Sequence, residues 1–185
     1  MATPADSVAI LNIYAPYVQD TTVSFETEVP SLEEFTARIE RISAEYPYLV
    51  YEADGKVVGY AYASRHRERA AYCYDVDLSI YFAPEHHGTG KAARLYGALF
   101  ALLAELGYCN TYAAYTEPNE KSRRFHEKCG FSPVGTFHHT GYKFGRWHDV
   151  TWVEKALKTP EQLPALLKSI RELPAKRVGE LLRPF

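Results

Sequence analysis

Cysteine is scarce in this chain of 185 residues, which has only Cys73, Cys109 and Cys129. Their number is odd and no two form a CxxC pair, so neither a disulfide framework nor a zinc ribbon is indicated. The histidines do not supply a metal site either. Adjacent histidines on a strand point to opposite faces, and only the pair His126 and Cys129 shares a helix face. We therefore expect free thiols and no bound metal.

Long hydrophobic runs are also missing, and neither sign of charge is in excess. No apolar stretch approaches the roughly 20 residues of a membrane span. The N-terminal "MATPADSVAI" has neither a basic leader nor a hydrophobic signal segment. The formal net charge is −2, whereas nucleic-acid binding needs a basic face. We expect a cytoplasmic protein that binds neither membranes nor nucleic acids.

Tyrosine, in contrast, is abundant, with 15 residues. Such a number suits a cleft that stacks on a ligand or binds a cation, but tyrosines also fill strands. Both readings stay open at the level of sequence.

The spacing of hydrophobic residues predicts an alternation of helices and strands. The expected helices are 6–18, ending at Pro16 or just beyond, 31–46, 91–106 and 119–129. The expected strands are 48–53, 57–64, 72–82, 110–116, 131–144 and 146–157. Asp54-Gly55 predicts a hairpin between the first two strands, because both residues tolerate positive φ. Ser31 and Glu34 form a predicted capping box at the start of the second helix.

The chain length fits one domain, which we expect at residues 1–157. Residues 158–185 then form a helical extension, interrupted by Pro174. Its apolar residues could cover the sheet, extend an interface or do neither; they are Leu163, Leu166, Leu167 and Ile170.

The segment "FAPEHHGTGKAARLY", residues 82–96, is a strand end, a glycine-rich turn and a helix start. This arrangement presents free N–H groups and a positive helix terminus to a phosphate. A P-loop is excluded, because Glu85 stands where it needs glycine and Ala92 where it needs a hydroxyl. A dinucleotide fingerprint is met only nominally, because the preceding strand alternates and Glu105, at the distance of the expected acidic residue, lies inside a helix.

A third kind of phosphate site fits better. "HGTGKA" follows the Gln/Arg-x-x-Gly-x-Gly/Ala motif of the Gcn5-related N-acetyltransferases (GNAT), with His87 in the first position. "TTVSFETE", "EPNEKSRRFHEKCGF" and "PVGTFHHTGYKFGRWHDV" extend the likeness over residues 3–157. The chain thus resembles the phosphinothricin and methionine-sulfoximine acetyltransferase subfamily. The resemblance implies an α/β (α+β) GNAT fold, with a mixed, mostly antiparallel sheet flanked by helices, and a homodimer.

The resemblance also implies a site for the co-substrate acetyl-CoA. The turn and first helical residues would hold its pyrophosphate through backbone amides, and the end of the preceding strand would polarise the thioester carbonyl. Asn119 would contact the pantetheine arm, although an asparagine there can also be a helix cap. The implied cofactor-binding residues are Ile80, Tyr81, Phe82, His87, Gly88, Thr89, Gly90, Lys91, Ala92, Ala93 and Asn119.

Two residues are candidates for proton transfer. Asp77 lies on the polar face of the strand 72–82 and matches the family's catalytic Glu, shorter by one methylene. It could instead be a solvated carboxylate or a partner of Arg67 or Arg69. His126 stands where many members of the superfamily have a tyrosine, and could protonate the leaving thiolate or simply pack against the sheet.

The amino-acid substrate would be held by Phe25, Arg69 and Tyr72. Arginine suits a substrate carboxylate because its planar group pairs with two oxygens, but Arg69 could also be a surface charge.

The predicted function is an acetyl-CoA-dependent N-acetyltransferase acting on the α-amine of a small amino acid or analogue, such as phosphinothricin, methionine sulfoximine or methionine sulfone, by direct transfer in a ternary complex. The alternatives are acetylation of another amine and a non-catalytic acyl-CoA sensor.

Overall fold

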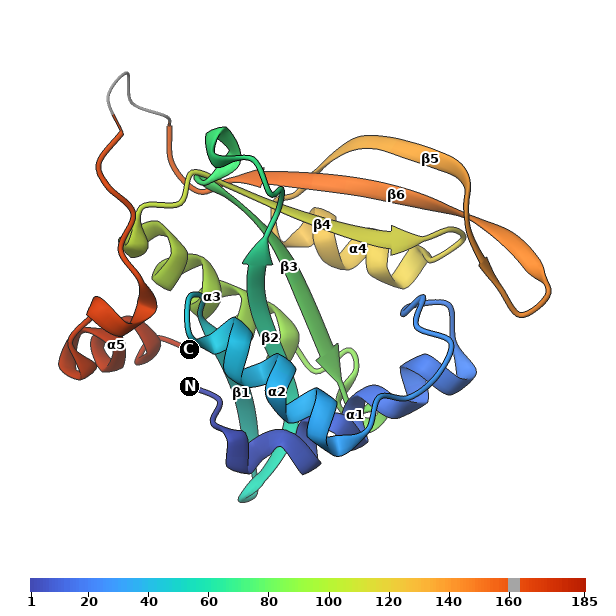
Figure 1. Cartoon of the computed structure of the whole chain (residues 1–185), viewed down its shortest axis with the longest axis horizontal. Coiled ribbons are helices and arrows are strands. Elements are labelled where there is room, and N and C mark those ends of the chain that lie inside the picture. Colours follow the sequence, from blue (N-terminus) through green and yellow to red (C-terminus); the bar gives the residue numbers. More distant parts are fainter. Residues whose placement is uncertain (160–163) are drawn as a thin grey trace.

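The computed structural model describes residues 1–159 and 164–185. Its centre is a six-stranded sheet in the order β1-β2-β3-β4-β6-β5 (Figure 1). The β3–β4 pair is parallel and the other pairs are antiparallel, which confirms the expected mixed, mostly antiparallel sheet. The strands are β1 (Tyr48–Ala53), β2 (Lys56–Arg65), β3 (Asp75–Phe82), β4 (Asn110–Thr116), β5 (Ser132–Lys143) and β6 (Arg146–Ala156).

Helices cover both faces of the sheet. Helices α1 and α2 pack on one face of β1–β3, α3 packs on the other, and α4 lies beside β4 (Figure 1). The helices are α1 (Ser7–Asp20), α2 (Leu32–Ser43), α3 (Lys91–Leu106), α4 (Glu120–Lys128) and α5 (Ala175–Leu182). Short 3₁₀ turns occur at Pro4–Asp6, Ala70–Tyr72, Pro84–His86 and Ile170–Glu172.

The local sequence signals act as predicted. The Ser31 hydroxyl accepts the amide of Glu34, and the Glu34 carboxylate accepts the amide of Ser31 at 2.9 Å. Asp54 and Gly55 have φ of 52° and 73°, as a tight hairpin turn needs. These two motifs fix the start of α2 and the register between β1 and β2.

The first helix runs further than predicted. It continues through Pro16 to Asp20, two residues beyond the predicted end at residue 18. Pro16 cannot donate to the carbonyl of Asn12, but both residues are exposed, so water can reach that carbonyl. The buried Ile13, Tyr14 and Val18 hold both halves of the helix against the core.

Tyrosines fill the layer between the sheet and helices α1 and α2. Tyr48 stacks on Tyr62 with ring centroids 4.8 Å apart, and Tyr60 stacks on Tyr81 at 5.2 Å. Tyr14 meets Tyr81 edge to face at 5.1 Å. Much of the tyrosine excess therefore goes into packing.

Strands β3 and β4 diverge after a short paired stretch. Their pairs are Asp75–Asn110, Val76–Thr111 and Asp77–Tyr112, and no pair follows. Beyond Asp77, β3 stays paired with β2 and β4 stays paired with β6. The sheet thus splits into two halves at Asp77, and we call the opening between them the β3–β4 divergence.

The C-terminal extension packs on α3. A Cβ on Gly97 would lie 2.5 Å from the ring of Phe185, and an ion pair joins Arg177 to Glu105 at 2.8 Å. Ile170 is buried in the same core as α3, whereas Leu166 is exposed. The predicted apolar position Leu163 lies outside the described residues, and the boundary at residue 157 stays a prediction.

All three cysteines are free, as expected; Cys109 is buried and Cys73 is exposed. In the described parts of the chain, no helix combines the length and the hydrophobicity needed to cross a membrane.

Candidate active site

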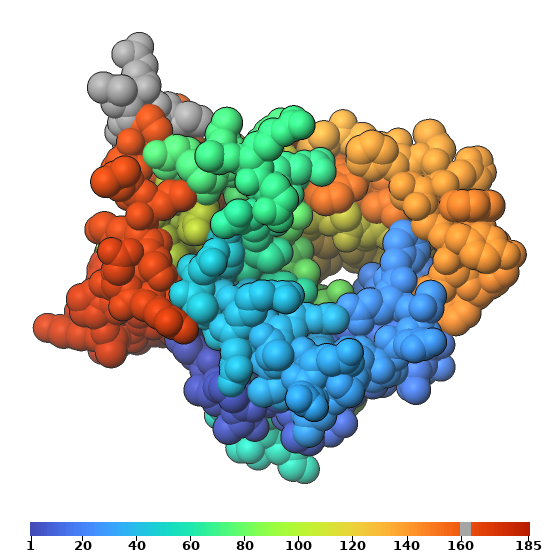
Figure 2. All heavy atoms as spheres, in the orientation of Figure 1, coloured from blue at the N-terminus to red at the C-terminus, as the bar shows by residue number. Residues whose placement is uncertain are grey.

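Asp77 lies at the point where β3 and β4 part. The alternation of β3 buries Val76 and Leu78 toward α3 and turns Asp77 to the opposite face, as the sequence predicted. Its side chain is 29% exposed. Burial raises the pKa of the Asp77 carboxyl, and a hydrogen bond from His66 opposes that effect. Figure 2 shows a hollow on this face, between the green β2–β3 region, the blue α1–α2 segment and the orange β5–β6 hairpin.

His66 is the partner of Asp77, and the sequence analysis missed it. The Nδ1 atom of His66 lies 2.6 Å from Oδ1 of Asp77. The imidazole stacks on Tyr112 with centroids 4.3 Å apart and planes 16° apart, and Trp152 meets its edge at 6.0 Å. Aromatic rings from β4 and β6 therefore hold this imidazole next to the carboxylate.

The divergence leaves one edge of β3 without a strand partner. The Ala83 amide bonds to the Val58 carbonyl on β2, whereas the Tyr74 carbonyl accepts the Cys109 amide on the β4 side. Because amides alternate along a strand, those of even-numbered residues point into the divergence. Ile80 and Phe82 thus present free amides there, and the Tyr81 amide points to β2. An oxyanion role stays a prediction for this edge.

The glycine turn has the geometry of a phosphate cradle. Gly88 and Gly90 have φ of 72° and 82°, which side-chain-bearing residues rarely adopt. A Cβ at either position would meet no atom within 4 Å, so the space beside the backbone is open. Helix α3 begins at Lys91, and its first amides have no partner inside the helix. This set of donors fits a diphosphate.

The side chain of His87 makes hydrogen bonds within the protein, whereas its backbone belongs to the glycine turn. Its Nε2 lies 3.0 Å from the carbonyl oxygen of Phe82 and 2.8 Å from the hydroxyl of Tyr17. Tyr17 also donates to that carbonyl. The imidazole therefore joins α1, the end of β3 and the turn. The side chain of Lys91 bends back to His86, with Nζ 3.0 Å from Nδ1.

The two polar residues predicted around α4 both have structural partners. Asn119 is the N-cap, and its Oδ1 accepts the amide of Ser122 at 3.0 Å. His126 is 5% exposed, and its Nδ1 lies 2.9 Å from the Ser122 carbonyl. Its ring packs against Tyr115 and Phe131. Burial lowers the pKa of His126, so the neutral imidazole is favoured. Its role as a proton donor stays a prediction.

The structure does not bring the three predicted substrate residues together by any contact among the described residues. Tyr72 is 43% exposed and meets the His66 ring edge to face at 6.3 Å. Phe25 packs on Gly141 of β5, where a Cβ would come within 2.2 Å of its ring. Arg69 precedes the 3₁₀ turn and forms no ion pair with the described residues. Tyr72 thus adjoins the His66–Asp77 pair, and Phe25 lies against the β5–β6 hairpin.

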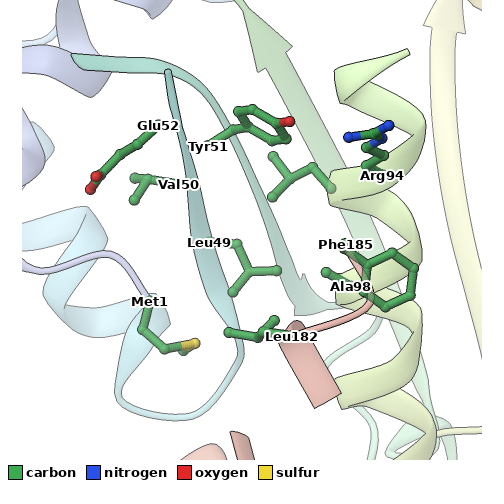
Figure 3. Close-up of a pocket in the computed structure, with 10 residues that line it drawn as sticks. Met1, Leu49, Val50, Tyr51, Glu52, Arg94, Ala98, Leu182 and Phe185 are labelled. Carbon is green, nitrogen blue, oxygen red and sulfur yellow. The ribbon is translucent and has the colours of Figure 1, made fainter. Parts of the chain in front are cut away.

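A separate cavity of about 300 Å³ lies between β1, α3 and the C-terminal residues (Figure 3). Leu49, Arg94, Leu182 and Phe185 are among its lining residues, and none of the predicted site residues is. Within residues 1–159 and 164–185, no three His, Cys, Asp or Glu side chains are grouped as a metal site requires.

Comparison with known proteins explains this combination of a divergent sheet and a glycine turn. Residues 1–152 match the model of the acetyltransferase (GNAT) domain. The chain belongs to the GNAT acetyltransferase family. It is 35% identical over 159 residues to the phosphinothricin N-acetyltransferase of Streptomyces viridochromogenes, covering 86% of this chain and 87% of that protein.

Two further relatives of this GNAT chain come from other bacteria. The L-methionine sulfoximine/L-methionine sulfone acetyltransferase of Salmonella typhimurium is 32% identical over 157 residues, which are 84% of this chain and 92% of that protein. The solved structure of a phosphinothricin acetyltransferase from Sinorhizobium meliloti in complex with acetyl-CoA superposes with a TM-score of 0.82 at 33% identity. The superposed region covers 88% of this chain and 92% of the Sinorhizobium meliloti chain. The predicted family, fold and enzyme class are confirmed.

Proposed function

We propose that this GNAT enzyme transfers the acetyl group of acetyl-CoA to the α-amine of a small amino acid or analogue, of the phosphinothricin, methionine sulfoximine or methionine sulfone type. The observation that carries the proposal is that one strand, β3, bears a partly buried carboxylate, Asp77, where its edge becomes free and leads at its end into the open glycine turn that starts at Gly88. Relatives named for these substrates, at 35% and 32% identity over most of the chain, support it.

The residues of the chain divide the work as follows. The amides of residues 88–93 bind the diphosphate, and the free amides of Ile80 and Phe82 stabilise the oxyanion that develops on the thioester carbonyl. Asp77 belongs to the group of residues that remove a proton from the substrate ammonium. Asn119 borders the pantetheine arm, and His126 protonates the leaving thiolate. Arg69 binds the substrate carboxylate, and Phe25 and Tyr72 enclose its side chain.

We also propose that transfer is direct, in a ternary complex of enzyme, acetyl-CoA and amine. Among the described residues, the groups that act on Asp77 are His66 and Arg67 and not a cysteine, and Cys109 is buried with its Sγ 3.9 Å from the Gly107 carbonyl. Initial-rate plots at several concentrations of both substrates should intersect. Parallel lines, the pattern of a covalent acetyl-enzyme, would contradict direct transfer.

The amine specificity is tested with a panel of amines and a thiol reagent that detects free coenzyme A. We expect turnover with phosphinothricin, methionine sulfoximine and methionine sulfone, and little with polyamines, aminoglycosides or peptide N-termini. Calorimetry with coenzyme A alone runs in parallel. Binding of coenzyme A without turnover on any amine would favour a sensor over an enzyme, and preference for a polyamine would overturn the substrate class.

A homodimer in the cytoplasm completes the proposal. Large apolar side chains are exposed along the β5–β6 hairpin, and burying them in a second copy would remove their apolar surface from water; they are Val134, Phe137, Tyr142, Phe144 and Trp147. The three free thiols suit a reducing compartment. Sedimentation of the wild type and of Trp147→Glu tests the dimer, and a wild-type monomer at micromolar concentration would contradict it.

A further inference from the structure

We propose that His66 accepts the proton of the substrate ammonium and that Asp77 acts by orienting His66. This inference rests on the proposed acetyl transfer and gives the base of that reaction a different identity from the carboxylate that the family resemblance pointed to.

The hydrogen bond between the two side chains fixes which nitrogen of His66 is free. A carboxylate can only accept, so Nδ1, at 2.6 Å from Oδ1 of Asp77, carries the hydrogen. The neutral imidazole then has its lone pair on Nε2. Nε2 has no hydrogen-bond partner among the described residues. Every fully buried side-chain nitrogen in those residues has a partner, so Nε2 must be accessible to solvent. The Nε2 lone pair is therefore open to a ligand.

The position of the imidazole suits this task. His66 follows β2 directly, and its ring stacks on Tyr112, the residue paired with Asp77 at the last point where β3 and β4 meet. Its side chain is 10% exposed, so the rings of Tyr112 and Trp152 restrict its rotation and leave a small opening. The His66–Asp77 pair, which we call the dyad, thus lies where β3 and β4 begin to diverge.

The chemistry favours an imidazole over a short carboxylate. Aspartate is one methylene shorter than the family's glutamate, and one of its oxygens is already occupied by His66. An imidazole gains and loses its proton near neutral pH, where a general base works best. The free Nε2 of His66 lies on the far side of the imidazole ring from the Asp77 carboxylate.

The step balances as follows. Nε2 of His66 takes one proton from the substrate ammonium, and the freed lone pair on nitrogen forms the C–N bond to the thioester carbonyl carbon. The C–S bond breaks, its electron pair leaves with sulfur, and the thiolate receives a second proton derived from the amine nitrogen. His66 releases its proton to water. The sum is ammonium plus acetyl thioester giving amide, thiol and one proton.

Several groups near the dyad contribute to its pH dependence. Arg67 stabilises the negative charge of Asp77 from the loop between β2 and β3. Tyr72 and Tyr112 face the imidazole from the 3₁₀ turn and from β4, and Tyr62 of β2 interacts with Asp77 from the same sheet face. The pH dependence of kcat/KM is therefore assigned by comparing variants with the wild type and not from the wild type alone.

Two replacements separate proton transfer from positioning. In His66→Asn the side-chain amide can still donate to Asp77 near the position of Nδ1, but it cannot accept a proton. In His66→Phe both functions are lost while the ring remains. We expect both variants to lower kcat/KM by about 100-fold, the lower end of what a general base contributes. In both variants, the acid limb of the pH profile, where kcat/KM falls as the pH decreases, should move to lower pH. The reason is that Asp77 alone remains as base.

The surface pair His138–Asp149 provides a matched control. Its Nδ1–Oδ2 distance is 2.8 Å, but His138 is 71% exposed and lies on β5. His138→Asn should leave kcat/KM and its acid limb unchanged. A His66→Asn variant as active as the wild type, with the same acid limb, would overturn the proposal and reduce His66 to a positioning residue.

Nitrogen-15 NMR of the histidine side chains gives a readout that needs no turnover. With the imidazole neutral, at about pH 9, His66 should show hydrogen on Nδ1 in the wild type and a mixture of both tautomers in Asp77→Asn. Hydrogen on Nε2 in the wild type would overturn the proposal. If the wild-type enzyme acetylates no amine in the panel, the proposed function fails by that result alone, whatever the tautomer.

Discussion

The Nζ atom of Lys143 lies 2.7 Å from the carbonyl oxygen of Ser24. These two residues are far apart in the sequence. The same ammonium bonds to the carbonyls of Val18 and Thr21 at 2.7 and 2.8 Å. Lys143 is 4% exposed. The three bonds join the β5–β6 hairpin to the last turn of α1 and to the segment after it, which carries Phe25.

Replacement of Lys143 by Met should therefore affect both stability and substrate binding. Three carbonyls would lose their shared donor, and each one that stays buried without a partner costs about 1–3 kcal/mol. Urea unfolding should show a loss of at least about 1 kcal/mol, and KM for the amine should rise more than KM for acetyl-CoA. Lys128→Met, at an exposed position on α4, is the control. Equal stability of the two variants would show that the ammonium contributes nothing to this junction.

Replacement of Gly90 by Ala should weaken coenzyme A binding far more than it weakens the fold. The residue has positive φ, so alanine costs about 1–2 kcal/mol of strain. The Cβ would meet no atom of the protein and would occupy the open space beside the turn that we propose for the diphosphate. We expect the Kd of coenzyme A to rise at least about tenfold, or 1.4 kcal/mol, by calorimetry.

Gly55 is the matched control for this change. It has a φ of 73° and the same open space, but it lies in the β1–β2 turn. Gly55→Ala should lower the melting temperature about as much as Gly90→Ala does and leave the Kd unchanged. If both variants bind coenzyme A equally well, the glycine turn is not the diphosphate site.

Much of this site could be predicted because its signals are local. The alternation of β3 determines which face Asp77 occupies, and the two glycines between a strand and a helix identify the turn. Neither inference needs the rest of the chain. Helix α1 was predicted by the same kind of signal to within two residues of its end, and burial of Val18 holds the part beyond Pro16 against distant residues.

His66 was missed because its relation to Asp77 is set by register. The β2–β3 pairs Ser64–Asp77 and Arg65–Val76 place His66 opposite Asp75 by continuation, and so diagonal to Asp77 on the same face. The connection from β2 to β3 has no tight turn that would fix this register from sequence. Lys143 was missed for a related reason, because its partners are backbone carbonyls that no side-chain pattern reveals.

The burial of His126 makes its predicted role sensitive to pH. Because its pKa is lowered, the imidazole is protonated only at acidic pH, and a proton donor must be protonated to act. If His126 protonates the thiolate, the loss of kcat in His126→Asn should grow as the pH falls from about 8 to about 5, well below the ordinary imidazole value. The asparagine amide can replace Nδ1 as donor to the Ser122 carbonyl. A loss of the same size at both pH values would assign His126 to packing alone.

Asp77 should also lower the stability of the fold at neutral pH, and Asp77→Asn tests this. Burial raises the pKa of its carboxyl above the unfolded value, so the folded protein holds this proton more tightly than the unfolded chain does. Stability from this group is full below the unfolded pKa and is lost as the pH rises through the folded pKa. Asp77→Asn, whose amide oxygen can still accept from His66, should therefore melt at a higher temperature than the wild type at about pH 7. This gain should shrink at about pH 4, near the unfolded value.

Asp149→Asn should behave in the opposite way. The hydrogen bonds from His138 and from the His139 amide lower the pKa of the Asp149 carboxyl, so its contribution is present at neutral pH and is lost on acidification. That variant should melt below the wild type at about pH 7 and approach it as the pH falls toward about 3. Thermal unfolding of the two variants and the wild type over this range measures both signs in one series. A lower melting temperature for Asp77→Asn at neutral pH would mean that the hydrogen bond from His66 to the carboxylate outweighs the cost of burying its charge. The dyad would then stabilise the fold.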